Sequence, residues 1–128
     1  MLRQQSLSEI QCSYAMSHGE FGDDVVASSK RVAVILTQSW CPDWKWMKGW
    51  VDRQAGQGQP ERMDIDVWQL EYNKVPFFDD FRAFKERTFN NYQIPYVRYY
   101  IDGSFTGDSN QVSFQEFCAR FREELPSE

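Results

Sequence analysis

Cys41 is the residue of this 128-residue sequence that is best placed to do chemistry. It follows residues 32–36, an unbroken apolar run that predicts a strand buried on both faces. Trp44, Met47 and Val51 then recur at helical spacing, which predicts a helix that begins near Cys41. A sulfur atom at the amino terminus of a helix faces unpaired backbone amides and the positive end of the helix dipole, and both favour thiolate over thiol. The sequence therefore predicts a reactive thiol at the end of a buried strand.

The charges beside Cys41 are mixed. Lys45 and Lys48 fall in the first two turns of the predicted helix and add positive potential near the sulfur atom, whereas Asp43 opposes it. The dipole and two cations against one carboxylate favour a modest stabilisation of the thiolate. Pro42 suits the first turn of a helix, because that turn needs no N–H from it, and it stiffens the chain beside the thiol.

Completing a disulfide exchange requires a second thiol, because a mixed disulfide is released only by attack of another thiolate. Trp44 lies three positions after Cys41, on the same helical face, where a resolving cysteine would stand. Cys12 and Cys118 lie in short helical segments and are predicted to be small core side chains. The resolving thiol is therefore expected from outside, as glutathione or a partner protein. A large movement that brings Cys12 or Cys118 to Cys41 is the remaining route.

Composition argues against several other classes of function. Fourteen Lys and Arg against nineteen Asp and Glu give a net charge of −5, which disfavours nucleic-acid binding. One histidine, His18, and three scattered cysteines cannot supply the four ligands of a structural zinc, so no metal site is predicted. No apolar stretch approaches the ~18 residues of a membrane span, and the first eight residues lack the apolar core of a secretion signal. We therefore expect a cytoplasmic protein that does not bind membranes.

The order of the predicted elements indicates an α/β domain. Apolar spacing, capping boxes and turn signals predict four helices, at about residues 7–17, 41–55, 76–90 and from 113 onward. Strands are predicted at 32–36, 63–71, 96–101 and 104–106, with a hairpin turn at Asp102-Gly103. The first helix is expected to begin at the capping box of Ser6 and Glu9. Helices between strands require parallel crossovers and the hairpin adds an antiparallel pair, so the sheet is expected to be mixed.

The segment from Trp40 to Trp44, Trp-Cys-Pro-Asp-Trp, resembles the active-site turn of the thioredoxin family in its W-C-P-D-C form. Ile94-Pro95, 54 residues beyond Cys41, resembles the cis-proline loop of that family, and the closing hairpin and helix also match. The resemblance implies a three-layer α/β/α sandwich with a central mixed sheet. The chain is expected to be one domain over residues 1–128, with the thioredoxin-like core at 25–125 and a helical extension at 1–24.

The resemblance also implies roles for individual residues. Cys41 would be the catalytic residue, and Pro95 would be cis and lie beside it. The backbone of Ile94 would pair with an extended substrate strand in a groove lined by Trp40. The substrate-binding residues are expected to be Trp40, Pro42, Asp43, Trp44, Ile94 and Pro95. Trp46 and Trp50 lie on another face of the same helix, and an exposed pair there would indicate a partner surface.

Two positions depart from the family pattern. The second cysteine is replaced by Trp44, and the buried acid that the family often places six residues before the first cysteine is replaced by Ile35. The first change removes the resolving thiol and the second removes the usual proton acceptor. Both argue against reduction of disulfides by a dithiol mechanism.

Three hypotheses remain open. The first is a monomeric, monothiol thiol–disulfide oxidoreductase that forms a mixed disulfide with a protein, peptide or small thiol through Cys41. The second is a non-catalytic module of the same fold that binds a peptide or protein in the groove. The third is glutathione-dependent binding of an iron–sulfur cluster by a dimer. The redox hypothesis requires that the sulfur atom of Cys41 be accessible to solvent and lie beside a cis Pro95.

Overall fold

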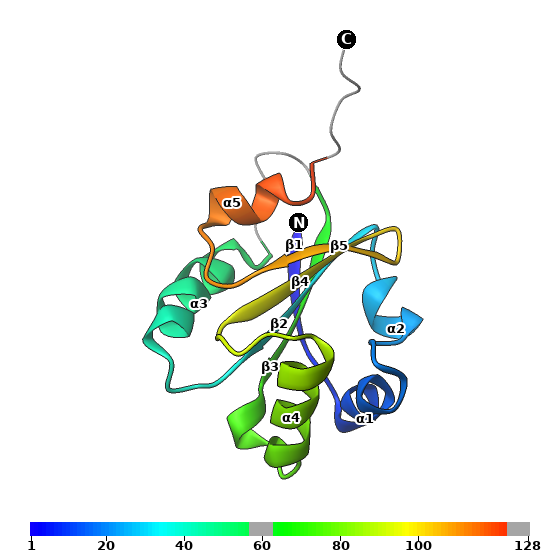
Figure 1. Cartoon of the computed structure of the whole chain (residues 1–128). Coiled ribbons are helices and arrows are strands. Elements are labelled where there is room, and N and C mark those ends of the chain that lie inside the picture. The colour runs from blue at the N-terminus through cyan, green and yellow to red at the C-terminus, as the bar shows by residue number, and fades with distance from the viewer. Residues whose placement is uncertain (57–62, 123–128) are drawn as a thin grey trace.

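In the computed structural model, residues 1–56 and 63–122 are described, and within them one mixed sheet runs through the molecule (Figure 1). Its strand order is β1-β3-β2-β4-β5. The central strand β2 pairs parallel with β3, which pairs parallel with β1, whereas β4 is antiparallel to β2 and β5 antiparallel to β4. The strands are β1 (Leu2–Ser6), β2 (Arg31–Thr37), β3 (Ile65–Glu71), β4 (Tyr96–Ile101) and β5 (Ser104–Ser109).

Helices cover both faces of this sheet, and the result is the predicted three-layer α/β/α sandwich (Figure 1). One face carries α3 (Pro42–Gln54) and α5 (Phe114–Ala119). The other face carries α1 (Glu9–His18), α2 (Asp23–Val26) and α4 (Phe78–Thr88), and a short 3-10 helix, η1 (Tyr72–Lys74), follows β3. None of the helices in the described ranges has the length and apolar character needed to cross a membrane.

The central strand β2 is buried on both faces, as its unbroken apolar sequence predicts. Because side chains alternate along a strand, Ala33 and Ile35 pack on the side of α3 and α5, whereas Val34 and Leu36 pack on the side of α4. A strand that is covered on both faces cannot shift its register by one residue without burying the wrong side chains. The loop that leaves β2 is therefore held firmly at its start.

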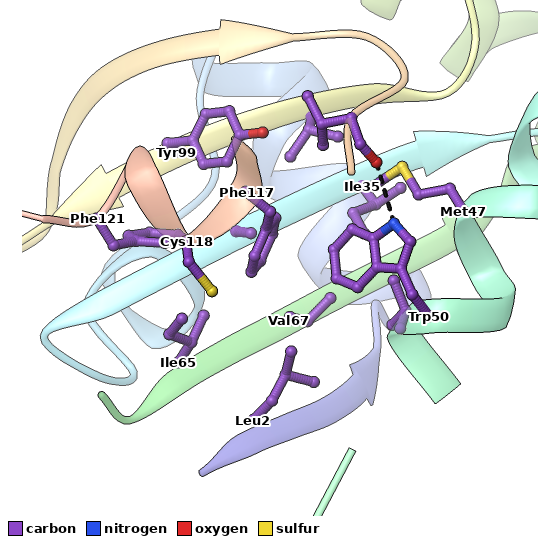
Figure 2. Close-up of a cluster of buried hydrophobic side chains, with 14 of the residues drawn as sticks. Leu2, Ile35, Met47, Trp50, Ile65, Val67, Tyr99, Phe117, Cys118 and Phe121 are labelled. Carbon is purple, nitrogen blue, oxygen red and sulfur yellow. Dashed lines mark hydrogen bonds between the residues drawn. The ribbon is translucent and has the colours of Figure 1, made fainter. Parts of the chain in front are cut away.

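Trp50 is buried, so Trp46 and Trp50 do not form the exposed pair that would indicate a partner surface. It has 4% of its surface exposed, whereas Trp46 has 54%. Figure 2 shows the indole of Trp50 pointing into the cluster beneath α5, and its Nε1 donates a hydrogen bond to the Val112 carbonyl at 3.0 Å. Its ring lies 5.0 Å from that of Phe117. Helical spacing could not show this burial, because α5 comes from the far end of the chain.

The amino-terminal segment also differs from its prediction. Helix α1 is capped by Ser8, whose side chain accepts from the Gln11 backbone N–H while the Gln11 side chain accepts from the Ser8 N–H, so the expected start at Ser6 is wrong. The residues before it form β1, which the sequence analysis missed, and Leu2 of β1 is fully buried. The short helix α2 was also missed, in a segment expected to be loop. Within residues 1–24, β1 joins the sheet and α1 packs on its face.

The second predicted capping box is confirmed. Ser113 accepts a hydrogen bond from the backbone of Glu116, and the Glu116 carboxylate accepts one from the Ser113 N–H. This cap starts α5 in the orientation that lays Phe117 on the sheet, where it closes the core over β4 and α3.

Candidate functional site

Cys41 lies at the amino-terminal cap of α3, immediately after the loop that leaves β2. Its backbone is extended, with φ −69° and ψ 120°, and Pro42 opens the helix as predicted. The Cys41 N–H donates to the Gln38 carbonyl at 3.2 Å, and the Gln38 side chain accepts a hydrogen bond from the Trp40 indole at 2.7 Å. These bonds define the path of the loop and the direction of the Trp40 ring.

A second contact anchors this loop from the end of β3. The Ser39 N–H donates to the Asn73 side chain at 2.9 Å, and the Asn73 amide donates to the Ser39 hydroxyl at 2.8 Å. Asn73 belongs to η1, so the carboxyl ends of β2 and β3 are tied together beside the thiol. Sequence reasoning missed Asn73, because a polar residue in a turn carries no pattern that indicates what it contacts.

The loop before β4 lies against the thiol. The Ile94–Pro95 peptide bond is cis. The Cys41 Sγ donates to the Ile94 carbonyl, with a sulfur–oxygen distance of 3.7 Å. Two segments that are 53 positions apart in the sequence thus meet at one sulfur atom. Ile94 is half-buried and Pro95 is buried, so the face of the loop that a bound chain could contact is that of Ile94.

Three consecutive carbonyl oxygens of this loop each accept a hydrogen bond from a different side chain. The Gln93 carbonyl accepts from the Lys85 ammonium, and the Ile94 carbonyl accepts from the Cys41 thiol. The Pro95 carbonyl accepts from the Asn110 amide at 3.1 Å. The donors come from α4, from the start of α3 and from the segment after β5, so the position of the loop depends on the whole sandwich. Sequence reasoning missed both Lys85 and Asn110.

The thiol is almost covered by the protein. Cys41 has 5% of its surface exposed and belongs to the core cluster beneath α3 and α5. This differs from the accessible thiol that the redox hypothesis requires. The loop before β4 contributes to the burial, because the Ile94 carbonyl contacts Sγ.

Trp44 is fully buried, which contradicts the expectation that it contacts substrate and agrees with its place in the apolar stripe of α3. Its Nε1 donates to the Glu71 carboxylate at 2.9 Å, and Lys74 pairs with the same carboxylate at 3.0 Å. Burial opposes ionisation of Glu71, but these two partners outweigh it and lower the pKa of the carboxyl group. The side chain that replaces the second cysteine is therefore a bonded part of the core.

The other residues expected to bind substrate lie at the surface around the thiol. Trp40 has 59% of its surface exposed, and Pro42 and Asp43 are exposed in the first turn of α3. Tyr92, in the loop before the cis bond, has 69% exposed and was not singled out by sequence reasoning. The exposed Trp40 ring beside Cys41 suits contact with another chain better than binding of a small ion.

The remaining cysteines are part of the core. Cys12 of α1 is fully buried on the opposite face of the sheet, where burial raises the pKa of its thiol to about 12. Cys118 of α5 has 3% of its surface exposed. Within residues 1–56 and 63–122, no three His, Cys, Asp or Glu side chains gather in a way that could hold a metal ion.

One cavity of the structure lies away from the thiol. It has a volume of about 400 Å³, opens between α1 and α4, and is lined by Ser13, Met16, Ser17, Asp80 and Phe84. None of these side chains belongs to the Cys41 site.

Comparison with known proteins identifies the fold. No protein-family model matches the sequence, and no curated protein matches it in sequence. Among solved structures, oxidised thioredoxin O1 of Arabidopsis thaliana is similar over 92% of both chains, with a TM-score of 0.59 at 12% identity. Thioredoxin O2 of the same plant covers 91% of this chain and 89% of its own, with a TM-score of 0.60 at 11% identity. A thioredoxin variant of Halobacterium salinarum is similar over 98% of this chain and 94% of its own, with a TM-score of 0.59 at 13% identity. At these identities the likeness shows that this chain has the thioredoxin fold and nothing further.

Proposed function

We propose that this thioredoxin-fold protein binds an extended protein or peptide segment beside the cis-proline loop and exchanges disulfides with it through the single thiol of Cys41. The observation that supports this is the contact of Cys41 Sγ with the Ile94 carbonyl at the amino terminus of α3. The thiol thus lies beside the loop with which an extended segment would pair.

The reaction has two steps. The Cys41 thiol loses its proton to solvent, and the thiolate attacks one sulfur atom of a substrate disulfide. A bond forms between Cys41 Sγ and that sulfur, the substrate S–S bond breaks, and the second substrate sulfur leaves as a thiolate. An external thiol such as glutathione then attacks the mixed disulfide, takes over the substrate sulfur and restores the Cys41 thiol.

An external thiol is needed because the residues around Cys41 offer none. Trp44 occupies the position of the resolving cysteine and is bonded to Glu71. Cys12 lies in the core on the other face of the sheet. Cys118 belongs to the same core cluster as Cys41 but is itself buried, so the cycle that we propose uses an external resolving thiol.

The burial of Cys41 supports a second candidate, a non-catalytic module that binds an extended chain in the same place. Only 5% of the surface of Cys41 is exposed, and its thiol already donates a hydrogen bond to the Ile94 carbonyl. In this case Ile94 and the exposed Trp40 would hold the bound segment by backbone pairing and ring contact, with no bond to sulfur.

The two candidates are separated by exposing the reduced, folded protein to glutathione disulfide and locating adducts by mass spectrometry of peptides. The redox proposal predicts one glutathionyl group on Cys41, its absence in Cys41→Ser, and its release by excess glutathione. Cys118→Ala is the matched control, since it removes a buried thiol of the same cluster and should keep the adduct on Cys41. Absence of an adduct on Cys41 under conditions in which free cysteine reacts would contradict the redox proposal.

The binding candidate is tested with a library of extended peptides. Trp40→Ala should weaken binding, while Trp46→Ala should leave it unchanged. The two indoles are similarly exposed, at 59% and 54%, but only Trp40 borders the thiol. Equal loss in both variants would show that the bound segment lies elsewhere on the surface.

A further inference from the structure

Lys85 is a fully buried lysine on the inner face of α4. Its neighbours on that face, Phe81 and Phe84, are core side chains, and the spacing of α4 would suit an apolar residue at position 85 equally well. Burying an ammonium group is costly unless a polar partner compensates it. The position of the Lys85 head group therefore needs an explanation beyond packing.

The Lys85 ammonium donates to the carbonyl of Gln93, in the loop that closes over Cys41. This carbonyl immediately precedes the one that accepts from the thiol, and the next one along the chain is held by Asn110. Lys85 and Asn110 thus hold the loop on both sides of Ile94. The contact between Ile94 and Cys41 lies at the centre of this arrangement.

The charges around Lys85 do not supply an alternative partner. Arg82 and Glu86 lie on the same helix and pair with each other at 3.3 Å, and Glu86 acts on Lys85 only at longer range. From β4 the Tyr96 ring faces the ammonium, with its centroid 5.5 Å away, and the hydroxyl of that ring accepts from Arg98. Burial lowers the pKa of Lys85 to about 8, with Arg82 adding to the effect and Glu86 opposing it.

We infer that Lys85 is a positioning residue of the Cys41 site, which holds the Gln93 carbonyl and thereby keeps the Ile94 carbonyl closed over the thiol. Lys85 acts through the loop and does not touch the sulfur atom. Its role in exchange rests on the proposed function, but its role in closing the thiol does not. Without this hydrogen bond the loop opens more often and the Cys41 sulfur atom becomes accessible.

The test compares the alkylation rates of the three cysteines by iodoacetamide in the full chain, with and without Lys85→Met. Methionine fills a similar volume but donates no hydrogen bond. We expect alkylation of Cys41 to rise at least about fivefold, in line with loss of one charged hydrogen bond, while that of Cys12 stays unchanged. Cys12 is the internal control, since it lies on the other face of the sheet and reacts only when the whole protein opens.

If Lys85 had a purely structural role, Lys85→Met would destabilise the fold and raise the alkylation rates of Cys12 and Cys41 together. That result, or an unchanged rate at Cys41 in a folded Lys85→Met protein, would overturn the inference. Arg87→Met, on the exposed side of α4, should change neither rate. If Lys85→Met does not fold, Lys85→Gln provides the same comparison, since its polar head can be hydrated but is too short to reach the Gln93 carbonyl.

Asn110→Ala gives an independent check from the other side of the loop. It should also raise alkylation of Cys41 selectively, because Asn110 holds the Pro95 carbonyl. A selective rise in both variants without any glutathione adduct in the wild-type protein would support the role of Lys85 and contradict the proposed redox function. The two conclusions can therefore fail separately.

Discussion

Thr37, the last residue of β2, carries a buried hydroxyl group that has no hydrogen-bond partner among the described residues. It lies four positions before Cys41, at the end of the strand that leads into the Cys41 loop. Burying an unpaired hydroxyl costs free energy, because its bonds to water are lost and not replaced. The end of β2 is therefore less stable than its apolar sequence alone would allow.

Thr37→Val should raise the free energy of unfolding by about 1 kcal/mol, because valine keeps the branched shape and removes the unpaired hydroxyl. Chemical denaturation measures the change. Thr106→Val is the control, since its hydroxyl donates to the Tyr99 carbonyl at 3.3 Å and its loss should not stabilise the protein. A lower stability for Thr37→Val would mean that this hydroxyl has a partner in solution.

Glu71 provides a prediction for pH dependence. Its pKa is lowered in the folded state, since the hydrogen bond from Trp44 and the pairing with Lys74 outweigh its burial. It therefore contributes stability that is fully present above the unfolded pKa of a glutamate and is lost as the pH falls through the folded pKa. In Glu71→Gln the stability of the protein should fall less steeply over this acid range. The measurement is the free energy of unfolding as a function of pH in both proteins. If it falls equally steeply in the wild type and in Glu71→Gln, the lowered pKa of Glu71 and its bond to Trp44 are contradicted.

Among the elements, the first helix and the last helix of the described chain, α1 and α5, each begin with a capping box. Ser8 starts α1 and Ser113 starts α5, and in each the residue three positions on completes the box. Helix α5 is only six residues long, yet it carries Phe117 and Cys118, which close the core around Trp50 (Figure 2). A short helix has few internal hydrogen bonds, so its cap contributes a large share of its stability.

Ser113→Ala should lower the free energy of unfolding by about 1 kcal/mol, as expected for loss of a capping side chain. Ser113→Asp should restore most of it, since aspartate also accepts from the backbone of the first turn and favours the helix dipole. Thermal unfolding measures both variants. If the alanine variant is as stable as the wild type, α5 is held by its packing on the sheet alone.

At the scale of the whole molecule, one ion pair joins the segment after α1 to the sheet. The Arg98 guanidinium of β4 donates to the Glu20 carboxylate at 2.6 Å, and the Tyr100 hydroxyl donates to the same carboxylate at 2.7 Å. Arg98 is nearly buried and lies over the rings of Phe89 and Phe105, 3.8 Å and 4.1 Å from their centroids. These contacts connect α1, β4 and β5 on one side of the sandwich.

Glu20→Gln should lower the free energy of unfolding by roughly 2 kcal/mol, because it leaves the buried Arg98 guanidinium without a counter-charge. The value is set below that of a fully buried pair, since the Glu20 side chain is 35% exposed. Glu9→Gln, an exposed carboxylate in the first turn of α1, is the control and should change stability much less. Chemical denaturation checks both, and similar losses would mean that the pair with Arg98 is solvated.

The central parts of this protein follow from its amino-acid sequence. The unbroken apolar run predicts β2, and the helical stripe predicts α3 with Trp44 inside. The resemblance of residues 40–44 and of Ile94-Pro95 to the thioredoxin family implies the fold. These features depend on local periodicity and on residue types whose effect on the backbone is strong. The tertiary structure decided β1, the burial of Trp50, the closure of Cys41 and the position of Lys85. Each of these depends on a segment far away in the sequence, because burial and hydrogen bonding are set by what packs against a side chain and not by its own neighbours in the chain.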